Sequence, residues 1–121
     1  MQVEQVDFLS IVSQDLERSR RFYLDTLGLP LERELPMGFE VTCGQVTLSV
    51  WDPSKVGIPF APNPNDIALR VDDVAARRAE LEERGVEFMG EILDTGVCHM
   101  AFFHDPDGNA LMLHRRHAPR D

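Results

Sequence analysis

Residues 15–23 read Asp15-Leu16-Glu17-Arg18-Ser19-Arg20-Arg21-Phe22-Tyr23, and a second segment of the same design begins at Asp73. Each segment opens on an aspartate, a favoured helix N-cap, and is followed by a glycine, Gly28 or Gly85, of the kind that ends helices. The aspartates are 58 positions apart (73 − 15) and the glycines 57 (85 − 28). The chain therefore carries one capped helix twice, which predicts a duplicated module.

Strand patterns surround both helices in the same order. Residues 8–13 and 66–71 precede the helices and alternate apolar with polar side chains, as half-buried strands do. Three further strands are predicted after each helix, at 31–34, 38–43 and 45–51 in the first half and at 86–91, 98–104 and 109–114 in the second. Each half therefore reads βαβββ, which predicts the α+β class.

The chain length and one proline-rich stretch set the predicted domain organisation. At 121 residues the chain suits one domain, here 1–121. Residues 52–64 hold four of the eight prolines and lack a periodic pattern, so they predict a linker. We expect module one at about 5–52, the linker at about 53–64 and module two at about 65–115, from the pattern boundaries.

One hairpin can be predicted residue by residue. The run Asp105-Pro106-Asp107-Gly108-Asn109 suits a type I turn on its proline and second aspartate, followed by a left-handed glycine. This turn pairs Asp105 with Asn109 and therefore Phe102 with Met112. The last two side chains then share one face of the sheet.

Composition limits the function classes. A net charge of −9 and a pI near 4.8 argue against a nucleic-acid partner, because phosphates require a basic surface. No apolar run approaches the roughly 20 residues that span a bilayer, and the first residues lack a signal-peptide pattern, so we expect no membrane partner and a cytoplasmic location. In that reducing compartment Cys43 and Cys98 are expected to be buried thiols rather than a disulfide.

Two of these motifs together resemble a known family. The helix segment beginning at Asp15, with Leu27-Gly28-Leu29 after it, and the later run Phe103-His104-Asp105-Pro106-Asp107-Gly108-Asn109 are similar to the glyoxalase, bleomycin-resistance and extradiol-dioxygenase superfamily, also called vicinal oxygen chelate proteins. The resemblance covers almost the whole chain. It implies a curved mixed sheet around a cup, with helices outside, and a homodimer.

The resemblance also implies where a metal would sit. In the family's enzymes a divalent metal in the cup chelates vicinal oxygens, and the matching positions here are Phe8, Ser49, Asp66 and Met112. Only Asp66 is an ordinary ligand, whereas a catalytic site needs about three imidazole, carboxylate or thiolate donors. We therefore predict no metal ligands and no cofactor.

A metal site could also be formed by residues outside the family positions, and the strand alternation limits which residues could form it. Among the remaining donors, only Asp66, Cys98 and His114 form a plausible trio on one face, and His117 is assigned to a polar tail.

The same alternation predicts what lines the cup. The predicted ligand-binding residues are mostly apolar, aromatic or thioether side chains with a few polar points: Phe8, Ser10, Thr47, Ser49, Trp51, Asp66, Arg70, Cys98, Met100, Phe102, Met112 and His114. Such a lining suits a hydrophobic, aromatic or cationic organic ligand.

Three functions stay open at this point. The first is a metal-free protein that binds a small molecule in the apolar cup. The second is a lyase, isomerase or dioxygenase-like enzyme, either metal-independent with Asp66 as catalytic base or using an unorthodox metal site. The third is an assembly or regulatory module without a ligand.

Overall fold

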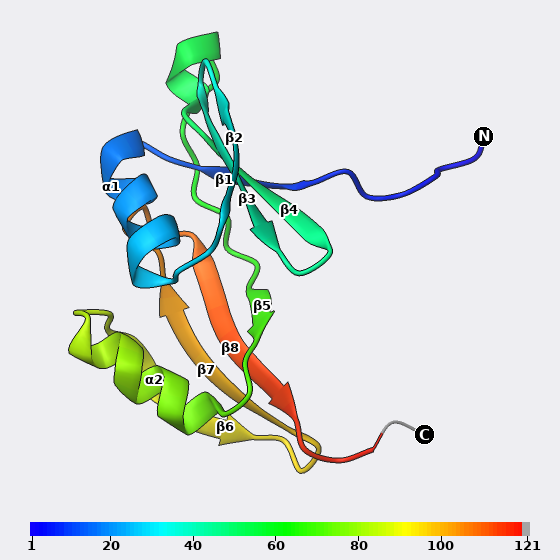
Figure 1. The fold of residues 1–121 in the computed structure, drawn as a ribbon, viewed down its shortest axis with the longest axis vertical. Coiled ribbons are helices and arrows are strands. Elements are labelled where there is room, and N and C mark those ends of the chain that lie inside the picture. The colour runs from blue at the N-terminus through cyan, green and yellow to red at the C-terminus, as the bar shows by residue number, and fades with distance from the viewer. Residues whose placement is uncertain (120–121) are drawn as a thin grey trace. The chain divides into compact units, whose positions relative to one another are not determined.

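The computed structural model describes residues 1–119, and these divide into two compact units (Figure 1). Unit 1 is Met1–Pro62, and unit 2 begins at Asn63. The first eight residues of unit 1 carry no regular secondary structure. Each unit is built around its own four-stranded mixed sheet.

Unit 1 contains a four-stranded sheet and one helical segment. Its elements are β1 (Leu9–Val12), α1 (Leu16–Arg20), η1 (Arg21–Thr26), β2 (Leu31–Leu35), β3 (Gly38–Cys43), β4 (Val46–Trp51) and the short helix η2 (Pro53–Val56). The strand order is β1-β4-β3-β2, with β1 parallel to β4 and the other pairs antiparallel.

Unit 2 repeats this connectivity. Its elements are β5 (Ile67–Arg70), α2 (Val74–Glu83), β6 (Phe88–Asp94), β7 (Cys98–His104) and β8 (Ala110–Arg116). The strand order β5-β8-β7-β6, with β5 parallel to β8, matches that of unit 1 element by element. The predicted α+β class and the duplicated βαβββ pattern are confirmed. The strand β6 lies two to three residues later than predicted, and β8 continues two residues further.

Both predicted caps are present. The carboxylate of Asp15 accepts the Arg18 backbone N–H at 3.1 Å, and that of Asp73 accepts the Ala76 N–H at 3.0 Å. The first helix begins as an α-helix, and after Arg20 it widens into the π-helix η1, in which the Leu27 N–H donates to the Phe22 carbonyl at 2.8 Å. The 3.6-residue pattern does not reveal such a turn, because it changes the backbone spacing and not the residue types.

Alternation along the strands gives each sheet a buried face and a second, more exposed face. In unit 1 the buried face carries Ile11, Phe39, Val41, Leu48 and Val50. In unit 2 it carries Ala101, Phe103, Leu111 and Leu113, and α2 packs against β6, β7 and β8. The opposite faces carry most of the residues that the sequence assigns to ligand binding, whereas Phe8 and Asp66 lie just before β1 and β5.

The β7–β8 hairpin follows the predicted pairing. Phe102 pairs with Met112, and the Asp105 N–H donates to the Asn109 carbonyl at 3.0 Å. Asp105 is 5% exposed as a residue, and its carboxylate accepts hydrogen bonds from the backbone of Asp107 and from both the backbone and the side-chain amide of Asn109, at 2.8 to 2.9 Å. The Asn109 side-chain oxygen in turn accepts the Asn63 N–H.

Replacing this carboxylate should cost stability. We expect Asp105→Ala to lower the free energy of unfolding by about 2 kcal/mol, because buried donors lose a charged acceptor. Urea denaturation measures this change, and Asp105→Asn, which keeps one oxygen acceptor, should lose less. Equal stability of Asp105→Ala and the unaltered protein would show that these bonds contribute nothing.

The linker differs from the prediction in one respect. It contains the single-turn helix η2, which is capped by Asp52 through a hydrogen bond from the Ser54 N–H at 3.0 Å. The prolines around it masked the helical pattern. Among residues 1–119, no helix is both long enough and apolar enough to cross a membrane.

Candidate ligand-binding site

A pocket of about 380 Å³ lies on the sheet face of unit 1 opposite the buried core. Its lining residues come from the end of the N-terminal segment, from β1, from the end of β2 and the β2–β3 turn, and from β3 and β4: Phe8, Ser10, Leu35, Pro36, Met37, Glu40, Ser49 and Trp51. The sequence predicted Phe8, Ser10, Ser49 and Trp51 for ligand binding, and the structure brings these four together. Their role in binding stays a prediction.

Strand register explains why these side chains meet. Ser10 of β1 pairs with Ser49 of β4, and Ser49 pairs with Glu40 of β3, so one row of polar side chains crosses three strands. Two residues further along β4, Trp51 pairs with Gly38 of β3. A methyl group on Gly38 would overlap the Val50 carbonyl oxygen and lie 2.7 Å from the Trp51 Cα, so only glycine fits beside the tryptophan.

The sequence did not predict four of the pocket residues, Leu35, Pro36, Met37 and Glu40, and Glu40 is the charged one among them. Its side chain is 7% exposed, and its Oε1 accepts two hydrogen bonds from Arg33, from Nε at 3.2 Å and from Nη2 at 2.9 Å. The Arg33 side chain is itself 66% exposed. The available signal was the alternation of residues 38–43, which places Glu40 on the face opposite the apolar side chains of Phe39 and Val41.

Trp51 is held in place from its polar edge. Its indole N–H donates a hydrogen bond to the hydroxyl oxygen of Ser10. Thr47, which was also predicted to bind ligand, lies further along β4 and donates its hydroxyl hydrogen to Glu32 Oε1 at 2.9 Å. It is not among the residues that line the pocket.

The remaining predicted ligand-binding residues lie in unit 2. Four of them are paired neighbours on one partly exposed sheet face: Met100 with His114, and Phe102 with Met112. Arg70 is exposed and also pairs with His114. Asp66 is exposed immediately before β5, and Cys98 is buried, with its Sγ 3.1 Å from the Thr95 hydroxyl oxygen. Their part in binding stays a prediction.

The family-type metal positions do not provide a ligand set in either unit. Unit 1 contributes the phenyl ring of Phe8 and the hydroxyl of Ser49, and unit 2 contributes Asp66 and the thioether of Met112. One carboxylate among these four does not supply the roughly three donors that a catalytic divalent metal needs. The residues at these four positions therefore do not fit a catalytic divalent metal.

The alternative trio of Asp66, Cys98 and His114 is not assembled. Ile67 pairs with Leu111 near one end of β8, whereas Cys98 pairs with Arg116 at the other end. Five residues of strand correspond to about 17 Å, which is too far for a shared ion.

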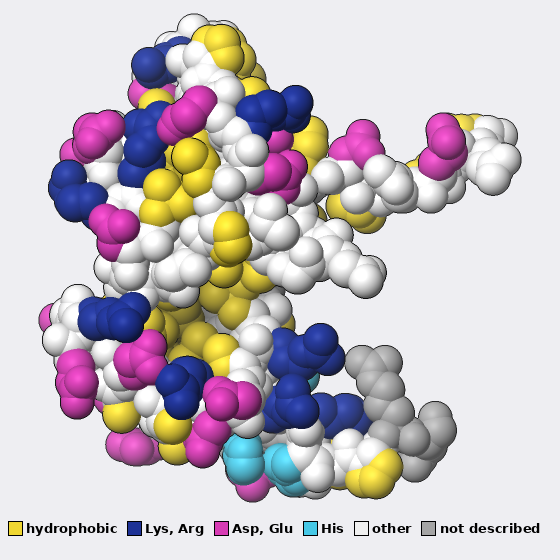
Figure 2. Space-filling model, in the orientation of Figure 1, with side chains coloured by type: hydrophobic (Ala, Val, Ile, Leu, Met, Phe, Trp, Pro, Cys, Tyr) yellow, Lys and Arg dark blue, Asp and Glu magenta, His cyan; other side chains and the backbone are white. Residues whose placement is uncertain are grey.

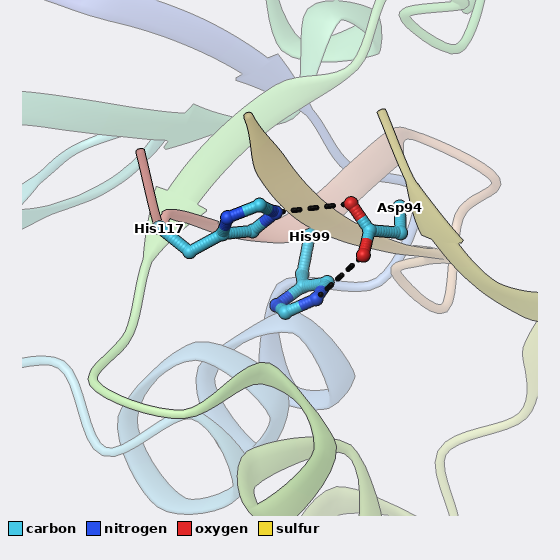
Figure 3. A group of neighbouring side chains, drawn as sticks. All are labelled: Asp94, His99 and His117. Carbon is cyan, nitrogen blue, oxygen red and sulfur yellow. Dashed lines mark hydrogen bonds and ion pairs between the residues drawn. The ribbon is translucent and has the colours of Figure 1, made fainter. Parts of the chain in front are cut away.

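A different group of donors is brought together in unit 2. Within residues 1–119, one group of His, Cys, Asp or Glu side chains is spaced closely enough to share a metal ion. It consists of Asp94, His99 and His117 (Figure 3). His117 follows β8 in the segment predicted to be a polar tail, and there it forms a hydrogen bond with Asp94 that the sequence did not predict. The hydrogen bond from His117 and a second one from the Gly96 N–H lower the pKa of the Asp94 carboxyl to about 2.

Both cysteines are free thiols. Cys98 is buried as predicted, whereas Cys43 is only half-buried, because it ends β3 next to the β3–β4 turn. Burial nevertheless raises the pKa of the Cys43 thiol.

Comparison with known proteins identifies the family. Residues 5–113 match the model of the Glyoxalase/Bleomycin resistance protein/Dioxygenase superfamily. The solved structure of TnmS3, an antibiotic binding protein from a Streptomyces species, is 31% identical with a TM-score of 0.79, and the match covers 96% of this chain and 98% of that one. "Glyoxylase I 4" of Arabidopsis thaliana is 27% identical over 85% of this chain and 66% of its own length, and "Glutathione transferase FosA" of Serratia marcescens is 26% identical over 93% and 81%. The chain belongs to the glyoxalase/bleomycin resistance protein/dioxygenase superfamily.

Proposed function

We propose that the chain is a small-molecule-binding protein that holds a planar, largely apolar organic ligand in the unit 1 pocket. The observation that carries the proposal is a pocket of about 380 Å³ with a mostly apolar lining and two buried polar side chains, Glu40 and Ser49. Ligand sites typically combine such a volume with an apolar wall and a few fixed polar groups.

The apolar wall provides the affinity in this proposal. Phe8 is 51% exposed, and with Leu35, Met37 and Trp51 it offers surface that a ligand would remove from water. The hydrogen bond to Ser10 fixes the edge of the indole ring, so little side-chain freedom is lost when a ring stacks on its face. Methionine adapts to ligands of different shape.

The polar side chains provide the selectivity. The carboxylate of Glu40 is positioned by Arg33 and lies next to Ser49 in the strand register. A carboxylate and a hydroxyl are both acceptors, so they favour a ligand that presents a hydrogen-bond donor or a cationic group. Arg33 offsets part of the negative charge, and for this reason a neutral donor is also accommodated.

The relative named as an antibiotic binding protein supports this proposal, since its match extends over nearly all of both chains. Met100, Phe102 and Met112 form a mostly apolar face of unit 2, and the ligand-binding role predicted for them is kept in this proposal for that unit by itself. A homodimer and a single-domain organisation remain part of the proposal.

The experiment titrates the protein with planar aromatic compounds, including aromatic antibiotics, by calorimetry and by Trp51 emission. Because Trp51 is the only tryptophan of the chain, its emission reports on this pocket. The role of the Glu40 carboxylate is tested with a matched set of compounds: naphthylmethylammonium, naphthylmethanol and naphthoate. We expect their affinity to decrease in that order. Glu40→Gln should remove the preference for the cation. No heat and no quenching with any compound would refute the proposal.

An enzyme is the second candidate, favoured by the nearly buried carboxylate of Glu40 beside an apolar pocket, which is an environment used for general bases. The relatives named as glyoxylase and glutathione transferase are enzymes by name. Asp66, the base predicted from the sequence, is exposed in unit 2. A turnover that is lost in Glu40→Gln or in Asp66→Ala would favour a lyase or isomerase over a binding protein.

A further inference from the structure

Asp94, His99 and His117 form a compact group of metal-ligand side chains at one end of the unit 2 sheet (Figure 3). The His117 Nε2 lies 3.0 Å from Asp94 Oδ1, and the His99 Nε2 lies 3.3 Å from Asp94 Oδ2. One ligand atom from each residue lies within 4.8 Å of those from the other two. The group belongs to unit 2, whereas the pocket residues belong to unit 1.

The strand pairing positions all three side chains. Asp94 is the last residue of β6 and pairs directly with His99 of β7. His117 follows β8, and its backbone N–H donates to the Val97 carbonyl at 2.8 Å, which ties the segment after β8 to the β6–β7 turn. The Gly96 N–H donates to Asp94 Oδ1 at 2.8 Å and orients the carboxylate. Three segments of the chain therefore converge, with the carboxylate already held in place.

The donor chemistry fits a borderline divalent ion. Two imidazole nitrogens and one carboxylate oxygen, with remaining positions for water, are a common zinc ligand set. Donors bound at about 2.0–2.1 Å in a tetrahedron lie about 3.3 Å from one another. The two observed nitrogen-to-oxygen distances, 3.0 and 3.3 Å, are close to this spacing.

The surroundings allow an ion to enter. The side chains of His99, Asp94 and His117 are 42%, 55% and 36% exposed. Figure 2 shows histidine side chains on the surface of unit 2 beside acidic ones, and also Lys or Arg side chains nearby. Arg115, the strand partner of His99, is one cation that would weaken binding of an ion without blocking it.

We propose that Asp94, His99 and His117 form a surface site for a divalent transition-metal ion, with Zn²⁺ the ion that the donor set fits best. A bound ion would crosslink β6, β7 and the segment that follows β8. Binding to the folded state alone would then raise the melting temperature of the protein.

The test uses the full-length protein without an affinity tag, treated with EDTA and then desalted. Calorimetric titration with ZnCl₂ should show one equivalent of Zn²⁺ bound per chain. Bound Co²⁺ should show the visible absorption that is typical of this ion when few nitrogen and oxygen ligands hold it. Asp94→Asn, His99→Gln and His117→Gln should each weaken Zn²⁺ binding at least about tenfold, because each removes one of only three protein ligands. The controls His104→Gln and His114→Gln change the other two histidines of the chain and should bind normally.

A second readout does not depend on the variants. In NMR spectra of the unaltered protein, Zn²⁺ should shift the imidazole signals of His99 and His117 and leave those of His104 and His114 in place. The proposal is overturned if Zn²⁺ shows no saturable binding. It is also overturned if the two control histidines shift instead, or if the three ligand variants fold and bind as the unaltered protein does.

Discussion

Gly38→Ala is expected to lower the free energy of unfolding by about 3 kcal/mol or more, in the range of severe overpacking. The added methyl group would overlap the Val50 carbonyl oxygen and approach the Trp51 Cα to 2.7 Å. Both neighbours are backbone atoms of β4, so no side-chain rotation relieves the contact. The strands β3 and β4 would have to separate where they form the pocket floor. Urea denaturation followed by circular dichroism measures the loss.

Gly44→Ala is the matched control within the same β3–β4 hairpin. Gly44 has a φ of +63°, but nothing lies within 4 Å of an added methyl group. The cost should therefore be only the backbone strain, about 1 kcal/mol. If Gly38→Ala proved no more destabilising than Gly44→Ala, the close pairing of Gly38 with Trp51 would be wrong.

Trp51→Ala is expected to weaken ligand binding by about 30-fold, equivalent to about 2 kcal/mol, the usual effect of removing a central aromatic contact. The indole is the largest side chain that lines the pocket, and its ring is held by the hydrogen bond to Ser10. The measurement is calorimetric titration with the tightest compound found for the unaltered protein, since the variant has no tryptophan emission.

Two further variants separate stacking from general damage to the sheet. Trp51→Phe keeps an aromatic face but not the indole N–H, so its affinity should lie between those of Trp51→Ala and the unaltered protein. Val46→Ala changes an exposed apolar side chain of the same strand outside the pocket and should bind normally. Normal binding by folded Trp51→Ala would remove this residue from the site.

Local signals in the sequence were sufficient for most of the fold. The capping aspartates Asp15 and Asp73 and the turn at residues 105–109 each act over a few residues, so their structure is encoded locally. Strand alternation then indicated which side chains share a face, and Ser10, Ser49 and Trp51 do lie together in the lining of one pocket, while their role in binding stays a prediction.

Two of the residues that the sequence did not predict, Glu40 and His117, depend on contacts between segments. Glu40 enters the pocket because β3 pairs with β4 in one particular register and because Arg33 on β2 balances its charge, and neither fact is local to residue 40. His117 joins Asp94 because β8 continues to Arg116 and the next residue bonds to Val97. The predicted end of that strand at residue 114 left no reason to bring His117 back to the sheet.

The most direct test of the binding proposal is to map a bound aromatic compound on the ¹⁵N-labelled protein by NMR. We predict that the largest shifts occur at the backbone amides of Met37, Glu40 and Ser49 and at the indole N–H of Trp51. If the compound binds and the largest shifts fall outside the pocket lining, or if no tested compound shifts these signals, the proposal that the unit 1 pocket is the binding site is contradicted.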